Sequence, residues 1–143
     1  KKNGTPDLLL FSFHGMPQRY LEKGDPYYCF CQKTARLTTE RLNLPEESFK
    51  VAFQSRFGSE KWLEPYDDRV LIDEARNGLE HVQVISPGFS VDCLETLEEI
   101  SIQYRELFLN NGGKKFDYIP CLNDTDTHIS LIKTIIDENV QNW

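Results

Sequence analysis

Four short apolar runs, each followed by a stretch with helical spacing, constrain the fold of this chain more than any other feature of its sequence. The runs indicate strands at 7–13, 49–54, 81–86 and 116–120, and no hairpin turn joins one run directly to the next. Strands separated by helices pair in parallel, because the crossing helix returns the chain to the same end of the sheet. The pattern therefore predicts a doubly wound α/β fold, a four-stranded parallel sheet with helices on both faces.

The helical stretches are predicted at 27–43, 67–78, 92–110 and 127–140, and the third is the most informative. At about 100° per residue, one side of this helix collects apolar residues that should face the sheet, namely Leu94, Leu97, Ile100, Tyr104 and Phe108. The opposite side carries a row of oxygen-bearing side chains, namely Asp92, Glu95, Glu99 and Gln103. Such a row could pass a divalent cation along the helix, whereas a second interpretation makes Asp92 the helix cap and Glu95 its capping-box partner.

Size and charge limit the class of the protein and its partners. We expect one α/β domain over 1–143 with a polar linker at 1–6, and because Lys1 rather than Met comes first, we expect a piece of a longer protein. The net charge of −7, from 16 Lys and Arg against 23 Asp and Glu, disfavours nucleic acid. No apolar run approaches the roughly 20 residues of a transmembrane helix and no export signal is present, so a cytoplasmic protein is expected.

The cysteines indicate a reducing compartment. Cys29, Cys31, Cys93 and Cys121 are too sparse for a disulfide scaffold, so free thiols are expected. Cys29 and Cys31 are the one close pair, and their spacing differs from that of most metal and iron–sulfur sites. No tightly bound cofactor is therefore expected, and an iron–sulfur cluster is disfavoured.

His14 is the first candidate for chemistry, because it directly follows the first predicted strand. Ligands of parallel α/β sheets bind beyond the carboxyl ends of the strands, where Ser55 and Phe89 are also expected. An imidazole can accept a proton near neutral pH or bind a borderline metal such as Fe²⁺. The alternative is a histidine that only hydrogen-bonds a loop carbonyl.

Three aromatic residues, Tyr27, Trp62 and Phe89, are expected in loops that follow strands. A flat apolar ligand would use such rings, but each ring could equally close a loop onto the sheet. Neither a G-x-G-x-x-G nor a P-loop motif occurs, so no motif in the sequence indicates binding of a dinucleotide or a nucleoside triphosphate.

Five segments closely resemble ferrochelatases of the bacterial type, in the same order and spacing. They are SFHGMP (12–17), GDPY (24–27), FQSRFGSEKWLEPY (53–66), PGFSVDCLETLEEI (87–100) and YIPCLND (118–124). The resemblance runs from about Asp7 to Asn139 and covers only the C-terminal half of a family member, which normally has two similar α/β halves with the porphyrin cleft between them. It implies a chelatase-like half domain of an enzyme, a lyase of haem biosynthesis that inserts Fe²⁺ into protoporphyrin IX to form protohaem.

The resemblance also implies roles for single residues. His14 matches the family's histidine at the metal and pyrrole-proton site, Glu95 the glutamate that faces it across the porphyrin, and Asp92 an acidic residue beside that glutamate. Glu99 matches the next carboxylate along an often π-bulged helix, so the implied metal ligands are His14, Glu95 and Glu99. The implied substrate-binding positions are Tyr27, Ser55, Trp62 and Phe89.

Two positions depart from the family pattern. Gln103 stands where a further carboxylate is often found, and Cys93 where some members have histidine. The sequence therefore does not decide which residues form the outer end of an iron path.

The implied chemistry needs a base and a weak metal site. The N–H protons at the centre of a planar porphyrin block the metal, so the binding site must bend the macrocycle and a base must remove the protons. We expect His14 and Glu95 to divide the proton and metal roles, with protoporphyrin IX, ferrous iron and the N-terminal half of the same enzyme as partners. The isolated half should be inactive. The alternatives are a cobalt or nickel tetrapyrrole chelatase and a non-catalytic tetrapyrrole- or metal-binding module.

Overall fold

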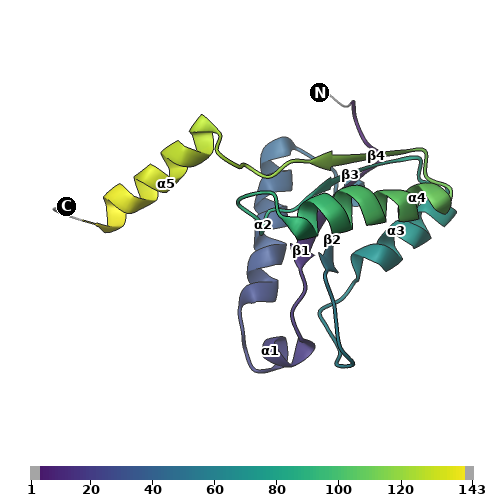
Figure 1. The fold of residues 1–143 in the computed structure, drawn as a ribbon, viewed down its shortest axis with the longest axis horizontal. Helices are drawn as coiled ribbons and strands as arrows, with labels where there is room; N and C mark the ends of the chain where they lie inside the picture. Colours follow the sequence, from purple (N-terminus) through teal and green to yellow (C-terminus); the bar gives the residue numbers. More distant parts are fainter. Residues whose placement is uncertain (1–3, 141–143) are drawn as a thin grey trace.

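The computed structural model describes residues 4–140, and their strands form one parallel sheet. The strands are β1 (Leu8–His14), β2 (Phe49–Gln54), β3 (His81–Ile85) and β4 (Lys115–Ile119). Their order in the sheet is β2-β1-β3-β4 (Figure 1), so the chain winds outward from β1 in both directions. The predicted fold class is confirmed, and β1 ends at the switch point where doubly wound sheets bind ligands.

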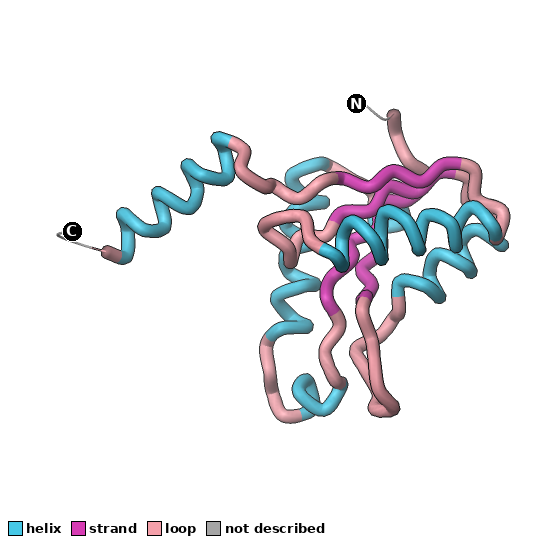
Figure 2. Tube along the Cα trace, in the orientation of Figure 1, coloured by secondary structure: helices cyan, strands magenta, loops and turns pink. Residues whose placement is uncertain are grey.

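Helices lie on both faces of this sheet. α2 (Tyr27–Leu42) covers one face, and α3 (Asp67–Arg76) covers the other together with a continuous helix made of η2 (Glu95–Tyr104) and α4 (Arg105–Asn110) (Figure 2). α5 (Asp126–Asn139) follows β4 and stands away from the sheet. Two short helices that the sequence did not predict are α1 (Gln18–Glu22) and η1 (Glu46–Ser48), which are too short to show a helical period.

The central strand supplies both hydrophobic cores. Leu8 and Leu10 belong to the cluster that contains α3 and α4 residues, whereas Leu9, Phe11 and Phe13 belong to the cluster beneath α2. Side chains alternate across a strand, so a strand covered on both faces has the continuous apolar sequence that predicted it. Each fully buried Leu or Phe stabilises the fold by about 1.5–3 kcal/mol. The packing on both faces therefore fixes β1, and with it the position of His14 at its end.

The long helix departs from the geometry that the sequence predicted. η2 is a π-helix of 10 residues, and it places Ile100 in the core while Tyr104 packs against it and Phe108 follows in α4. Leu94 and Leu97 are 73% and 51% exposed, so assigning them to the core was wrong. The reason is that π winding, with hydrogen bonds from i to i+5, turns successive residues through a smaller angle than an α-helix does.

Two expectations concern the chain as a whole. Of the predicted linker 1–6, residues 1–3 lie outside the described residues, and 4–6 have no regular secondary structure. The assignment of one domain to 1–143 stays a prediction. None of the helices described between 4 and 140 is long and apolar enough to cross a bilayer.

Candidate functional site

A hollow of about 360 Å³ opens at the carboxyl edge of β1 and β2, beside the π-helix. His14 lines it from the end of β1, and the segment after β2 adds Ser55, Arg56 and Phe57. The rest of the lining comes from the long helix, with Leu94, Glu95, Glu98, Glu99 and Gln103. The structure thus brings together five residues that the sequence singled out for chemistry. They come from three segments, with His14 at the end of β1, Ser55 after β2, and Glu95, Glu99 and Gln103 on the long helix.

Backbone contacts fix the position of His14. The next residue, Gly15, donates its N–H to the Gln54 carbonyl at 2.8 Å, and the Tyr27 hydroxyl donates to the His14 carbonyl at 2.8 Å. A Cβ atom at position 15 would lie 2.8 Å from that Gln54 carbonyl and 3.1 Å from the Trp62 ring. Glycine therefore allows the close approach of β1 and β2 that sets His14 at the rim.

The hydrogen bond of the His14 ring determines which nitrogen is available. Nδ1 lies 2.7 Å from the Gly15 carbonyl oxygen, which can only accept, so Nδ1 carries a hydrogen. The lone pair of the neutral imidazole is then on Nε2, the nitrogen that can bind a proton or a metal. The contact with a loop carbonyl, which the sequence offered as an alternative to chemistry, is thus present, and it involves Nδ1 and not Nε2. The Phe89 ring centroid lies 6.3 Å from that of His14.

Glu99 is held by three donors. Ser55 has a left-handed backbone, with φ of 63°, and its N–H and hydroxyl donate to the two Glu99 oxygens at 2.9 and 2.5 Å. The Tyr104 hydroxyl donates at 2.7 Å from five residues further along the helix, the spacing of a π-helix. Burial, followed by this bond to Glu99, raises the pKa of Tyr104, so its hydroxyl remains a donor.

Glu95 is half-buried and its carboxyl faces different surroundings. A hydrogen bond from Cys93, one from its own backbone N–H and the charge of His14 lower the pKa of Glu95 below its ordinary value. The Asp92 N–H, which a capping-box glutamate would bind, instead donates to Asn123 Oδ1 at 2.8 Å. The capping-box interpretation of Glu95 was therefore wrong.

Asp92 is not among the residues that line the hollow, and it lies just before the start of the long helix. Its Oδ1 accepts from the Tyr118 hydroxyl at 2.7 Å, the Thr96 hydroxyl at 3.1 Å and the Cys121 N–H at 3.2 Å, and its Oδ2 accepts from Asn123 Nδ2 at 2.7 Å. Burial alone would raise its pKa, but the bonds from Asn123, Tyr118 and Cys121 lower the pKa of Asp92 to about 2. Its carboxylate ties the helix start to the loop after β4.

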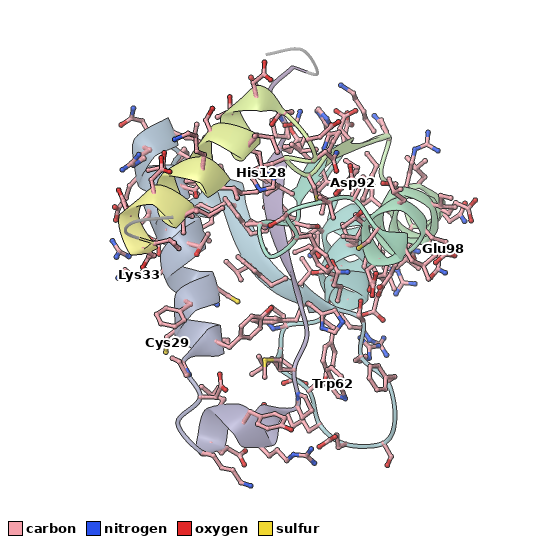
Figure 3. All side chains as sticks on the ribbon, turned by 60° about the vertical axis from the view of Figure 1, so that its left-hand side comes forward. Cys29, Lys33, Trp62, Asp92, Glu98 and His128 are labelled. Atoms are coloured by element: carbon pink, nitrogen blue, oxygen red, sulfur yellow. The ribbon has the colours of Figure 1, made fainter. Side chains whose placement is uncertain are left out.

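Some of the aromatic residues hold the loops around the hollow in place, and others lie at its edge. Trp62 is 5% exposed and donates from Nε1 to the Phe57 carbonyl at 2.9 Å, so it closes its loop (Figure 3). Tyr27 is the first residue of α2 rather than a loop residue, and both it and Phe89 are half-buried. Sequence reasoning missed Phe57, which lines the hollow and is 71% exposed. The available signal was its place in the same loop as Ser55.

The hollow is negatively charged. Glu98, a second residue that the sequence did not single out, accepts from Gln103 Nε2 at 2.6 Å and lies beside Glu95 and Glu99. The one arginine of the lining, Arg56, is paired with Asp68 through two hydrogen bonds of 2.7 Å, so its charge is largely compensated. The field of the hollow therefore attracts cations.

Among residues 4–140, no three His, Cys, Asp or Glu side chains are close enough together to hold a metal ion between them. All four cysteines are free thiols in this part of the chain. A larger groove of about 970 Å³ runs between α2 and β2, but its lining has no histidine and mixes Lys33, Arg36 and Lys50 with two glutamates. The hollow at His14 is therefore the better candidate for a functional site, because of the side chains that line it and despite its smaller volume.

The family model and the curated relatives that match this sequence carry the same name. The sequence model of the Ferrochelatase family matches residues 1–140. A ferrochelatase of Nitrosococcus oceani is 53% identical over 143 residues, which are 100% of this chain and 39% of that protein. A ferrochelatase of Francisella tularensis is 53% identical over 142 residues, which are 98% of this chain and 42% of that protein. The chain thus spans about two fifths of the length of these relatives.

Comparison with solved structures supports the fold. The putative cobalamin (vitamin B12) biosynthesis protein CbiX of Marinobacter aquaeolei matches with a TM-score of 0.59 and 14% identity, and the match covers 94% of each chain. Because the identity is low, this likeness concerns the fold alone. The match over residues 1–140 and the identity of about one half to curated ferrochelatases decide the family, and the chain belongs to the ferrochelatase family.

Proposed function

We propose that this chain is the part of a ferrochelatase that handles the metal and the pyrrole protons while Fe²⁺ enters protoporphyrin IX to form protohaem. The observation that carries the proposal is that His14 and Glu95, from distant segments of the sequence, line one hollow at the carboxyl edge of the sheet. Iron is a substrate in this proposal, and no resident cofactor is required. The assignment to the cytoplasm belongs to the same proposal.

The two residues have different roles. Nε2 of His14 accepts a pyrrole proton, and the hydrogen bond from Nδ1 to the Gly15 carbonyl stabilises the imidazolium that forms. Glu95, whose pKa is lowered, remains anionic and offsets the positive charges of the imidazolium and of Fe²⁺. Glu99 extends the anionic surface towards Ser55. A pair of such ligands with open positions holds Fe²⁺ weakly enough to release it.

The rim of the hollow suits a flat apolar ring. Phe57 and Leu94 are exposed beside the carboxylates, so a macrocycle can pack against carbon while its centre faces His14. Phe89 lies near the His14 ring. Tyr27 and Trp62 support the backbone around His14, so we assign them an indirect part in substrate binding. Asp92 positions the start of the helix that carries Glu95.

Iron insertion tests the proposal. Residues 1–143 replace the matching region of the Nitrosococcus oceani ferrochelatase, and haem formation from Fe²⁺ and protoporphyrin IX is followed by absorbance. We expect His14→Ala and Glu95→Ala each to lower the rate about 100-fold or more, the contribution of a positioned acid–base group. Co²⁺ and Ni²⁺ in place of Fe²⁺ test the alternative of another chelatase.

Two variants serve as matched controls. His81→Ala removes a histidine that pairs with Asp117 in the strand next to its own, and Glu106→Ala removes an exposed glutamate of α4. Both should keep nearly the full rate. Equal losses in the site variants and the controls would refute the assignment of His14 and Glu95.

A further inference from the structure

Behind the hollow, a chain of hydrogen bonds runs from the interior of the protein to Glu99. It begins at Asp67, the first residue of α3, and passes through Ser12 and Gln54 to Ser55. Asp67 and Ser12 are fully buried, and Gln54 is 1% exposed. A buried carboxyl group next to a metal-handling surface needs an explanation, because burying it costs free energy unless it is bonded.

The direction of each bond follows from the outer end of the chain. Ser55 Oγ gives its hydrogen to the Glu99 carboxylate, so it can only accept from Gln54 Nε2 at 3.2 Å. The same Nε2 lies 3.4 Å from the Glu95 carbonyl oxygen, which also can only accept. Gln54 therefore presents its NH₂ group to the hollow and its Oε1 to the interior.

At the inner end of this chain of hydrogen bonds, the contacts of Ser12 require a hydrogen on the Asp67 carboxyl group. Gln54 Oε1 lies 2.7 Å from Ser12 Oγ and takes the single hydrogen of that hydroxyl. The second short contact of Ser12, with Asp67 Oδ2, is left without a hydrogen unless the carboxyl group is protonated. Asp67 therefore donates to Ser12 as a neutral acid.

The surroundings of Asp67 support the neutral acid. Burial, and to a smaller extent the charges of Glu99 and Asp68, raise the pKa of Asp67 to about 8 although Ser12 acts in the opposite direction. Its Oδ1 has no hydrogen-bond partner among the described residues. A neutral carbonyl oxygen tolerates this isolation better than a carboxylate does, because the charged group loses more solvation.

We propose that Asp67 is a positioning residue for the metal-handling surface, which donates to Ser12 and so orients the Gln54 amide towards Ser55 and the backbone of Glu95. The inference rests on the proposed function of the hollow. Loss of the donor at position 67 frees Ser12 to turn away from Gln54, which removes the fixed donor beneath Ser55 and loosens the hold on Glu99. Asp67 itself contacts neither the metal nor the porphyrin.

The test uses Co²⁺ alone, a divalent stand-in for Fe²⁺ whose paramagnetism perturbs nearby NMR signals. ¹⁵N–¹H spectra of the full chain are recorded during a Co²⁺ titration for wild type, Asp67→Asn, Asp67→Leu and Ser12→Ala. Leu71→Ala is the control, since it weakens the core on the same helix without touching the hydrogen-bond chain. Glu99→Gln and His14→Ala report on the hollow itself.

Asp67→Asn keeps an N–H donor for Ser12, so its Co²⁺ dissociation constant and its Gln54 side-chain signals should stay close to those of wild type. Asp67→Leu and Ser12→Ala should shift the Gln54 signals and raise the dissociation constant about tenfold, as the loss of a supporting hydrogen bond does at metal sites. Leu71→Ala should lower the thermal midpoint and leave the dissociation constant unchanged. If Asp67→Leu does not fold, Ser12→Ala breaks the same chain at its next member.

The outcomes separate the two proposals. If Asp67→Asn weakens Co²⁺ binding as much as Asp67→Leu, the charge and not the donor matters, and the inference is overturned. The inference is also overturned if Asp67→Leu and Ser12→Ala bind Co²⁺ like wild type while Glu99→Gln and His14→Ala do not. If Glu99→Gln and His14→Ala bind like wild type as well, the proposed function of the hollow fails instead.

Discussion

Asp92 and Glu95 lie three positions apart at the start of one helix, yet their carboxylates meet opposite conditions. Asp92 accepts four hydrogen bonds, one from Tyr118 in β4 and two from the loop that follows it, whereas Glu95 lines the hollow beside His14. A carboxylate saturated with donors has no free lone pairs for a metal, and one that faces an open hollow has them. The difference comes from a loop distant in sequence, so the acidic row alone could not reveal it.

The low pKa of Asp92 gives a prediction about stability and pH. Because the pKa of Asp92 falls to about 2 on folding, its ionised form stabilises the protein above pH of about 4, by about 2 kcal/mol, and this contribution is lost as the pH falls towards 2. Asp92→Asn should therefore lower the free energy of unfolding by about that amount at neutral pH and by little near pH 2. Urea unfolding at a series of pH values measures both.

The control for this prediction is Asp124→Asn, since Asp124 is exposed in the loop that contains Asn123. It should change the free energy of unfolding little at any pH. A deficit of Asp92→Asn that is the same at neutral pH and near pH 2 would mean that the charge of Asp92 is not what stabilises the fold.

At the scale of elements, the strands and their partners could be predicted, but the winding of the long helix could not. A strand covered on both faces has a continuous apolar sequence, which is a strong local signal for β1. The exposed Leu94 and Leu97 look like core residues on an α-helical projection, because a π-helix leaves no separate period in the sequence. The burial of Trp62 and Asp67 could not be predicted from the sequence either, since it depends on contacts with Gly15 and Ser12.

The π-helix gives a prediction about register. Deleting Ile102, which is exposed within η2, should let the segment relax to an α-helix. Glu99 and Tyr104 are then four residues apart and stay on one face, whereas Glu95, at the start of η2, turns away from them. We expect the far-ultraviolet circular dichroism to remain similar and the Co²⁺ dissociation constant to rise about tenfold or more, because the Glu95 carboxylate no longer faces the hollow together with Glu99. Ile102→Ala keeps the length of the helix and should bind Co²⁺ like wild type. Tight binding by the deletion variant would show that the π register is dispensable.

At the scale of the whole molecule, the hollow is a surface with one side open to solvent. The chain supplies His14, Glu95 and Glu99 from one α/β unit and spans about two fifths of the length of its relatives. Iron insertion requires the macrocycle to be bent, and binding energy can bend a ring only when contacts press on both of its faces. In the proposed function, this one wall holds the metal, and a second wall is needed to distort the porphyrin.

The last prediction follows from this geometry. The 143-residue chain by itself should bind Co²⁺ at the hollow yet form haem from Fe²⁺ and protoporphyrin IX about 100-fold more slowly, or worse, than the chimera that restores the remaining length, since distortion contributes several kcal/mol to such a barrier. Haem absorbance at equal protein concentration measures the two rates, and NMR dispersion verifies that the isolated chain is folded. The metal-binding measurement makes the comparison specific, because a folded chain that binds Co²⁺ and lacks turnover is missing only the opposite wall. Turnover by the isolated chain near the rate of the chimera would place the whole porphyrin cleft within these residues and contradict the division of roles between the two parts of the enzyme.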